Sequence, residues 1–446
     1  MTPRTVVAAW CSAAVLVIAA TMLLQPQGAG LSTDAPVLIG APSPAEVNAI
    51  DLVRSDGNYR FERDSEGAWW QVRPFRHRMD TAQLMAIPEA LQRLRAVACV
   101  PLDVQQAGVL GVSGTAEDGR PLATLRLERA DGDTVVLHLG RTGIGGRGWL
   151  RVGDAHEALV VDSDLHAIAI HEAPQTWRDA RLLPDIGPST LQICRTIGDE
   201  IVELGRKGRH WRFLAPVETR ADAARVAEHI GNLAAAQFTA VLLDEPVDLR
   251  AFGLEPPFAS VLVASTDGAP ITLLIGDRVS GSTADRYAMI EGTPSIVRIS
   301  GETASSVLVE AIDLVDRTGS GIAQADVRSI RVLTGDGTLL LERELDRWRI
   351  AGGALADLGA VEGLLDVLLS MEAPDIAIVE TYPAELEVAT IVLEGGGHRP
   401  LDTVRVLREL PPPQGQGRWG LENGDGVFRI LPSGARVPLT AAEFSG

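Results

Sequence analysis

The chain has 446 residues, with 59 acidic against 40 basic side chains and a formal net charge of −19. This acidic excess argues against nucleic acid as a partner, because every contact with a phosphate needs a cation. Hydrophobic residues make up 46% of the chain and charged residues 22%, as in globular proteins, so wholesale disorder is excluded. The only lysine is Lys207, which precedes Gly208, so a Walker A phosphate loop is excluded too.

The N-terminal residues predict a membrane anchor. The run from Thr5 to Leu24 contains no charged residue, and twenty helical residues span about 30 Å, the thickness of a bilayer's hydrocarbon core. Arg4 precedes it and favours a cytoplasmic N-terminus. We therefore expect residues 1–24 to cross the cytoplasmic membrane once, residues 25–45 to form a tether, and the bulk of the chain to be extracytoplasmic (periplasmic). A cleaved signal peptide is the alternative.

Beyond the tether, tryptophans mark an internal repeat. Trp70, Trp211 and Trp348 each belong to a strand-like run that follows a polar hairpin. An amphipathic helix comes about ten residues later, and an aspartate precedes it as the expected N-cap. An apolar strand follows each helix. In the first copy Pro88 falls inside the helix and predicts a kink. The capping aspartates are Asp80, Asp222 and Asp357.

A second landmark lies further along each copy. Apolar strands end at Gly140 and Gly276, and 404–408 occupies the same place in the third copy. A polar loop and a strand-opening aromatic residue follow. Each unit reads β-β-β-α-β-β-β-β-β, so the fold class expected is α+β, with an N-terminal transmembrane helix and three mainly antiparallel sheet-plus-helix units. We place the units at residues 46–185, 186–320 and 321–446.

These residues resemble a bacterial family, the domain of unknown function number 4340. The resemblance rests on the tryptophan strand, the aspartate-capped helix, the phrase Phe252-Gly-Leu-Glu-Pro256, the strand Leu273–Gly276 and an aspartate-containing junction. It is best over about 180–320. In the first copy Asp103–Gly108 stands in place of the Gly-Leu-x-Pro phrase, and the third copy, 321–446, is degenerate. The resemblance implies an extracytoplasmic protein associated with gliding-type ABC exporters, so an ABC-type permease is the partner it suggests.

Familiar catalytic and ligand-binding motifs do not emerge from the sequence. Gly143–Gly148 fits the letters GxGxxG but lies between two expected strands, which indicates a hairpin loop. His166, His171, Asp162 and Asp164 are close in sequence, yet apolar residues separate the histidines, which favours packing over a metal site. We assign no catalytic, cofactor-binding or metal residue and expect no cofactor. Which small molecule, if any, the protein binds is unknown.

The cysteines carry no motif either. Cys99 and Cys194 lack a CxxC or Cys-His neighbourhood, and we expect free thiols. A disulfide between them is the alternative that an oxidising compartment allows.

Two sets of aromatic residues recur in the copies. Trp70, Trp211 and Trp348 are expected in the core. The strand-opening set is the candidate binding surface, because aromatics at loop edges can face solvent; it consists of Trp149, Tyr287 and Trp419. Three functions follow in order of preference: a non-catalytic scaffold or accessory protein of a membrane complex, a cell-envelope glycan or peptide binding module, and a hydrolase with a site between units.

Overall fold

The computed structural model describes residues 41–113, 120–143, 145–208, 210–266, 268–351, 353–378, 383–410 and 418–445. The predicted membrane segment, Thr5–Leu24, lies outside these residues. Within the described ranges, no helix combines the length and the apolar character that a membrane crossing requires. The chain divides into two compact units, the first reaching to Ala180 and the second beginning at Arg181.

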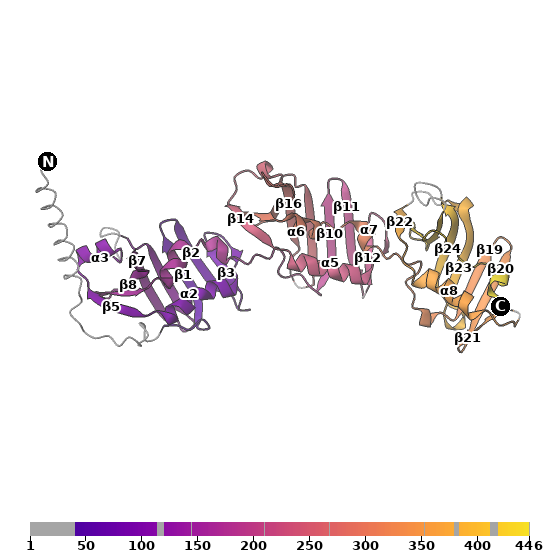
Figure 1. Cartoon of the computed structure of the whole chain (residues 1–446), viewed down its shortest axis with the longest axis horizontal. Coiled ribbons are helices and arrows are strands. Elements are labelled where there is room, and N and C mark those ends of the chain that lie inside the picture. Colours follow the sequence, from indigo (N-terminus) through magenta and orange to yellow (C-terminus); the bar gives the residue numbers. More distant parts are fainter. Residues whose placement is uncertain are drawn as a thin grey trace, which may run out of the picture. The chain divides into compact units, whose positions relative to one another are not determined.

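Three mostly antiparallel sheets with a few helices make up the described chain, so the α+β expectation is confirmed at that level (Figure 1). The first unit holds one sheet and the second unit holds two. The first two sheets follow the same path, in which the strand that directly follows the helix in sequence returns to the far edge of the sheet. The third sheet repeats this path with one strand fewer.

The first sheet has the order β4-β3-β2-β1-β6-β7-β8-β9-β5. Helix α2 (Thr81–Arg93) places Leu84, Ile87 and Leu91 in a core with residues of the sheet. Its strands are β1 (Val47–Arg54), β2 (Gly57–Arg63), β3 (Trp69–Arg73), β4 (His77–Arg78), β5 (Ala96–Pro101), β6 (Ala123–Arg129), β7 (Thr134–Gly143), β8 (Arg147–Val152) and β9 (Glu157–Asp162). The remaining helices of this unit are α3 (Val104–Leu110), α4 (Asp164–His166), the π-turn η1 (Ala167–His171) and the 3-10 turn η2 (Pro174–Trp177).

The second sheet has the order β13-β12-β11-β10-β15-β16-β17-β18-β14. Its strands are β10 (Thr190–Ile197), β11 (Glu200–Lys207), β12 (His210–Ala215), β13 (Thr219–Arg220), β14 (Phe238–Asp244), β15 (Ala259–Ser265), β16 (Ile271–Arg278), β17 (Arg286–Ile290) and β18 (Ser295–Ile299). Helix α5 (Ala223–Ala235) packs Val226 and Leu233 into the core of this sheet. Shorter helical segments are η3 (Arg250–Phe252), α6 (Gly301–Val307), α7 (Ala311–Leu314) and η4 (Gln324–Asp326).

The third sheet has eight strands in the order β21-β20-β19-β23-β24-β25-β26-β22. They are β19 (Ser329–Thr334), β20 (Gly337–Glu344), β21 (Arg347–Ile350), β22 (Asp375–Ile378), β23 (Glu387–Glu394), β24 (Pro400–Leu410), β25 (Arg418–Glu422) and β26 (Val427–Ile430). Helix α8 (Leu358–Leu369) buries Val361, Leu364 and Leu368 against it. The turns η5 (Ala384–Leu386), η6 (Gly396–His398) and η7 (Ala441–Phe444) complete the chain.

The three expected helix caps are confirmed. Asp80 and Asp222 each accept hydrogen bonds from two backbone N–H groups of the first turn, and Asp357 accepts one; these groups have no partner within the helix. The expected kink at Pro88 does not interrupt the first helix, which runs as one element from Thr81 to Arg93.

The tryptophan landmark of the first copy requires a correction by one residue. The backbone carbonyls of Trp211 and Trp348 accept hydrogen bonds from the residues just before Asp222 and Asp357, and in the first copy the carbonyl that does so belongs to Trp69. Trp69 is also the buried member, at 1% exposure, whereas Trp70 is half-buried and donates its Nε1 hydrogen to Asp64 (2.8 Å). Side chains alternate along a strand, so only one of two neighbouring tryptophans can face the core.

The Gly-Leu-x-Pro motif at Gly253 has a different counterpart in the first copy from the one expected. Gly253 ends η3 with a φ of 63°, and Gly111 ends α3 with a φ of 70°, so Gly111-Val112 takes the place of Gly253-Leu254. The prediction that Asp103–Gly108 replaces this phrase is therefore wrong: most of that stretch forms α3, and Asp103 is its N-cap.

The turn ending at Gly253 or Gly111 explains the strand glycines. A Cβ on Gly276 would lie less than 3.0 Å from the carbonyl oxygen of Phe252 in η3. A Cβ on Gly140 would meet the carbonyl oxygen of Leu110 in α3 in the same way. Glycine is needed at these two positions because backbone packs directly on the strand.

Candidate functional site

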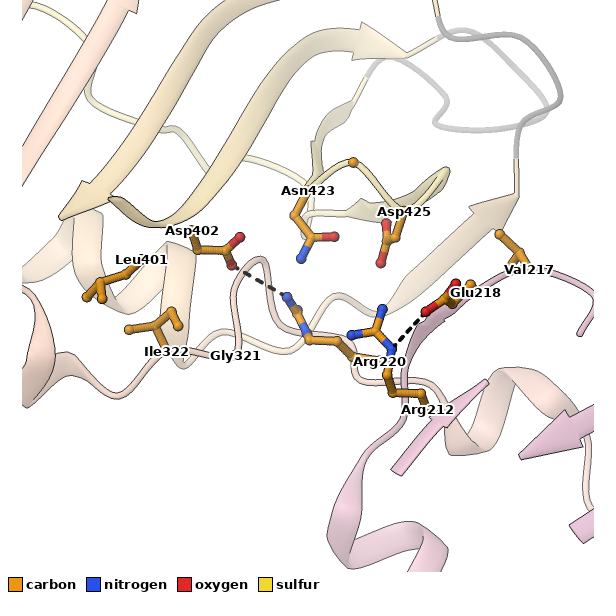
Figure 2. Close-up of a pocket in the computed structure, with 11 residues that line it drawn as sticks. Arg212, Val217, Glu218, Arg220, Gly321, Ile322, Leu401, Asp402, Asn423 and Asp425 are labelled. Carbon is orange, nitrogen blue, oxygen red and sulfur yellow. Dashed lines mark ion pairs between the residues drawn. The ribbon is translucent and has the colours of Figure 1, made fainter. Parts of the chain in front are cut away.

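The candidate site is a polar pocket in the second unit, where residues of the second and third sheets meet. Its volume is about 690 Å³. Strands β12 and β13 and the segment between them supply one side, and β24 and the β25–β26 turn supply the other (Figure 2). The lining residues are Arg212, Val217, Glu218, Arg220, Gly321, Ile322, Leu401, Asp402, Asn423, Gly424 and Asp425.

Arg220 lies at the centre of this pocket. It is the second residue of β13 and stands two residues before Asp222, the cap of α5, so both strand and helix hold its backbone. Its Nε donates to Oδ2 of Asp316 (2.9 Å), and its Nη2 donates to the carbonyl of Thr318 (2.6 Å). Its Nη1 lies 3.8 Å from Oδ2 of Asp402 in β24, the ion pair drawn in Figure 2. One guanidinium thus joins the second sheet, the connecting segment and the third sheet.

A second ion pair is buried beneath the pocket. Arg429 of β26 is fully buried, and its two terminal nitrogens donate to the two carboxylate oxygens of Asp425 at 2.9 and 3.2 Å. The same carboxylate accepts a hydrogen bond from the hydroxyl of Thr219 in β13 (2.5 Å). The Nε of Arg429 donates to the carbonyl of Asp316 (3.0 Å). A buried ion pair is tolerated when its remaining hydrogen-bonding capacity is satisfied in this way.

The half-buried carboxylates of Asp316 and Asp425 are both held in the ionised form. Burial alone would raise the pKa of Asp425, but hydrogen bonding and charge attraction from Arg429, with Thr219, outweigh it, so its pKa lies below the usual value. Burial likewise opposes ionisation of Asp316, and the charge of Arg220 with the hydrogen bonds of Thr318 lowers its pKa overall. Neither group carries a proton at neutral pH, so neither can act as a general acid there.

The rim of the pocket adds one more ion pair and no nucleophile. Nε of Arg212 lies 3.4 Å from Oε1 of Glu218, and a dashed line marks this ion pair in Figure 2. Among the described residues that line the pocket there is no serine, cysteine, histidine or lysine. We call this arrangement of paired charges the joint; it consists of Arg220, Asp316, Asp402, Asp425 and Arg429.

Comparison with protein families identifies the segment that contains half of this joint. Residues 211–389 match the model of the family described as a domain of unknown function, DUF4340. This segment of the chain belongs to the DUF4340 family. The match confirms the resemblance seen in the sequence, although it begins at Trp211 and runs on into the third sheet. No curated protein matches the chain.

The DUF4340 match covers one side of the joint and leaves out the other. Arg220 and Asp316 fall inside it, while Asp402, Asp425 and Arg429 come after its last residue. The acids and the arginine on the third sheet are therefore features of this chain outside the matched segment.

The arginine of the joint has a counterpart outside the DUF4340 segment. In the first copy Nε of Arg78 lies 3.6 Å from Oδ2 of Asp179, and Arg78 precedes the helix cap by two residues, as Arg220 does. In the third copy Leu355 occupies this position. The recurring Arg-x-Asp pattern was the sequence signal that could have found Arg220.

The aromatic residues proposed as a binding surface open strands as expected, but part of each ring is packed. Trp149 in β8 contacts the small cluster around Val112. Tyr287 in β17 meets Phe252 edge to face, with ring centroids 5.1 Å apart. Trp419 in β25 packs on the third core and lies under the guanidinium of Arg408. All three are half-buried, and their role in binding stays a prediction.

The histidine and glycine motifs of the first copy have structural roles. His166 is fully buried, and its Nε2 lies 2.9 Å from the carbonyl oxygen of Trp149. Its ring fills the space that a side chain at Gly148 would need. Gly143 ends β7 and Gly148 lies in β8, so these glycines belong to a hairpin and not to the start of a helix. No group of three metal-ligating side chains forms within the described ranges.

One cluster that sequence reasoning missed has the residue types of a catalytic triad. Ser329, His398 and Glu394 meet in the third sheet. However, Oγ of Ser329 and Oε2 of Glu394 both lie near the same ring nitrogen, Nδ1 of His398, at 3.2 and 3.1 Å. A triad needs the nucleophile and the acid on different ring nitrogens. Ser329 also donates to Glu394 (2.8 Å) and is buried, so this cluster is a structural network.

Both thiols that the structure describes are free. Cys99 and Cys194 form no disulfide, as expected. Burial, together with a hydrogen bond to Glu157, raises the pKa of Cys99 to about 11, and burial also raises that of Cys194. Such thiols are poor nucleophiles at neutral pH.

Proposed function

We propose that this DUF4340 protein is a non-catalytic, single-pass, extracytoplasmic scaffold or accessory protein of an ABC-type export complex. The observation that carries the proposal is the joint of the second unit. Arg220 reaches the third sheet through Asp402, and the Asp425–Arg429 pair reaches the second sheet through Thr219, so charges that are already paired tie the two sheets together. Such a joint holds two sheets as one body that can present a broad surface to partners, and it offers no reactive group.

The proposed location at the cytoplasmic membrane rests on the N-terminal residues. The uncharged run Thr5–Leu24 supports a membrane anchor, and the segment that follows it supports a tether. The family resemblance supplies the class of partner, an ABC-type permease. The bulk of the chain would then act on the periplasmic side of the cytoplasmic membrane.

Co-purification from native membranes tests this function. The full-length protein, tagged at its C-terminus and expressed from its own locus, is extracted in mild detergent, and the proteins bound to it are quantified by mass spectrometry. We expect an ABC-type permease to be enriched at least tenfold over a control that carries residues 1–45 fused to an unrelated folded domain. The control separates binding by the folded units from binding by the anchor.

Equal recovery of permease with both proteins, or none with either, would contradict the scaffold proposal. The same samples report the mature N-terminus: a chain starting near Leu31 would show that the apolar run is a cleaved signal and not an anchor.

A further inference from the structure

The second unit also contains an apolar groove, separate from the polar pocket except that both touch Val217. Its volume is about 740 Å³. The second sheet and its following helices contribute Phe213, Leu308 and Ile312, and the third sheet contributes Ile376 and Ile378. Two large apolar side chains of the lining stay exposed, Ile312 at 38% and Ile378 at 57%. An apolar surface left open in this way is typical of an interaction site.

One wall of the groove is an edge strand. Strand β22 stands at the end of the third sheet, and β26 is the one strand with which it pairs in the described chain. Ile376 and Ile378 are two residues apart on β22, so both point to the same face, and both line the groove. An unpaired strand edge beside apolar side chains has the features that an added peptide strand uses: backbone groups for affinity and pockets for alternate side chains.

The charge at the groove selects a cationic partner. Arg195 is committed to Glu200 and to the carbonyl of Val309 (3.1 Å). Glu310 also lines the groove and is exposed, and within the described structure its carboxylate makes no hydrogen bond or ion pair. It precedes α7 without capping it through its side chain. One carboxylate is therefore available beside an apolar surface.

We propose that this groove binds an extended segment of a partner protein, which adds to the free edge of β22. Alternate aliphatic side chains of that segment enter the groove, and a lysine or arginine of the segment lies next to Glu310. The proposal deepens the scaffold function, since it assigns the surface and the chemistry of the partner. Its test does not depend on an ABC-type permease, so the failure of one can be told apart from the failure of the other.

A random ten-residue peptide library displayed on phage is the probe. It is selected on the full-length protein in detergent, and the enriched peptides are synthesised and their affinities measured. We expect enriched sequences to alternate aliphatic residues and to contain Lys or Arg. Ile378→Arg should weaken their binding at least tenfold. Val247→Arg is the matched control, since Val247 is fully exposed and does not line the groove, and it should leave binding unchanged.

Two further variants separate the parts of the proposal. Glu310→Gln should weaken peptides containing Lys or Arg several-fold and should not affect the same peptides with norleucine in place of the cation. Of the two alternating patterns of backbone N-methylation in the peptide, one should abolish binding, because only every second residue of an added strand bonds to β22. Ile312→Arg serves as the second groove variant if Ile378→Arg fails to fold.

A selection without a common sequence pattern would overturn the proposal. Enriched peptides that bind the Ile378→Arg and Ile312→Arg variants as tightly as the unaltered protein would do the same.

Discussion

At the scale of single residues, the second unit depends on a few charged side chains that are paired with one another. Arg429 is fully buried, and its charge is compensated by Asp425 at hydrogen-bonding distance. Removing one partner of a buried pair leaves the other charge without compensation and costs about 3–5 kcal/mol. Arg220, by contrast, is part-buried, and its longer contact to Asp402 at 3.8 Å contributes less. The buried pair is therefore the stronger element of the joint.

His229 gives a prediction at the same scale. It lies on α5 at 5% exposure, and burial, together with the nearby charge of Arg195, lowers its pKa from 6.5 to about 4. Because the pKa of His229 is lower in the folded than in the unfolded state, protonation of this ring favours unfolding. Its contribution to the free energy of unfolding is fully present above pH 6.5 and is lost as the pH falls toward 4. Between pH 7 and pH 5 this group alone should remove about 2 kcal/mol from the free energy of unfolding.

The variant His229→Gln, which cannot titrate, should show a correspondingly smaller loss over that pH range. The free energy of unfolding is measured by urea titration at both pH values, with hydrogen–deuterium exchange of α5 peptides as the signal. An identical pH dependence in the variant and the unaltered protein would show that His229 does not titrate as described.

At the scale of elements, the packing of a helical turn on a strand recurs in two copies. Gly276 and Gly140 permit it, because a side chain there would strike a backbone carbonyl that cannot move away cheaply. We expect Gly276→Ala to destabilise the second unit by about 2 kcal/mol or more. Gly231→Ala is the control, since Gly231 lies inside α5 with open space around it and should stabilise the helix by about 0.5–1 kcal/mol. Urea titrations of the two variants measure both changes, and equal effects would contradict the packing account.

Elements with a local signal could be predicted from the sequence. The Asp caps and the apolar periodicity of the helices depend on residues within one or two turns, so the sequence alone predicts these helices correctly. The prediction of Trp70 as the core residue was wrong because the sequence does not show which face of the strand points to the core. The pairing of β3 with β2 determines that face. The equivalence of Gly111 and Gly253 was missed because α3 is longer than η3 and shifts the spacing.

At the scale of the whole molecule, the repetition of one sheet-and-helix plan was visible in the sequence, but the joint was not. Thr219 and Asp425 are 206 residues apart, so no local sequence pattern links them. The joint therefore belongs to the assembled second unit and to no single copy. Nothing in a single copy would have indicated that two of the three sheets share one compact unit.

We conclude that the second and third sheets form one body through the contacts that the Asp425–Arg429 pair of the third sheet makes with Thr219 and with the carbonyl of Asp316. Urea-induced unfolding of the full chain, followed by hydrogen–deuterium exchange of peptides from β10 and β15 and from β19 and β23, tests it most directly. We predict coincident midpoints for both sheets in the unaltered protein. In Arg429→Met we predict separate midpoints, with the third sheet unfolding at lower urea. Separate midpoints for the two sheets in the unaltered protein would contradict the account.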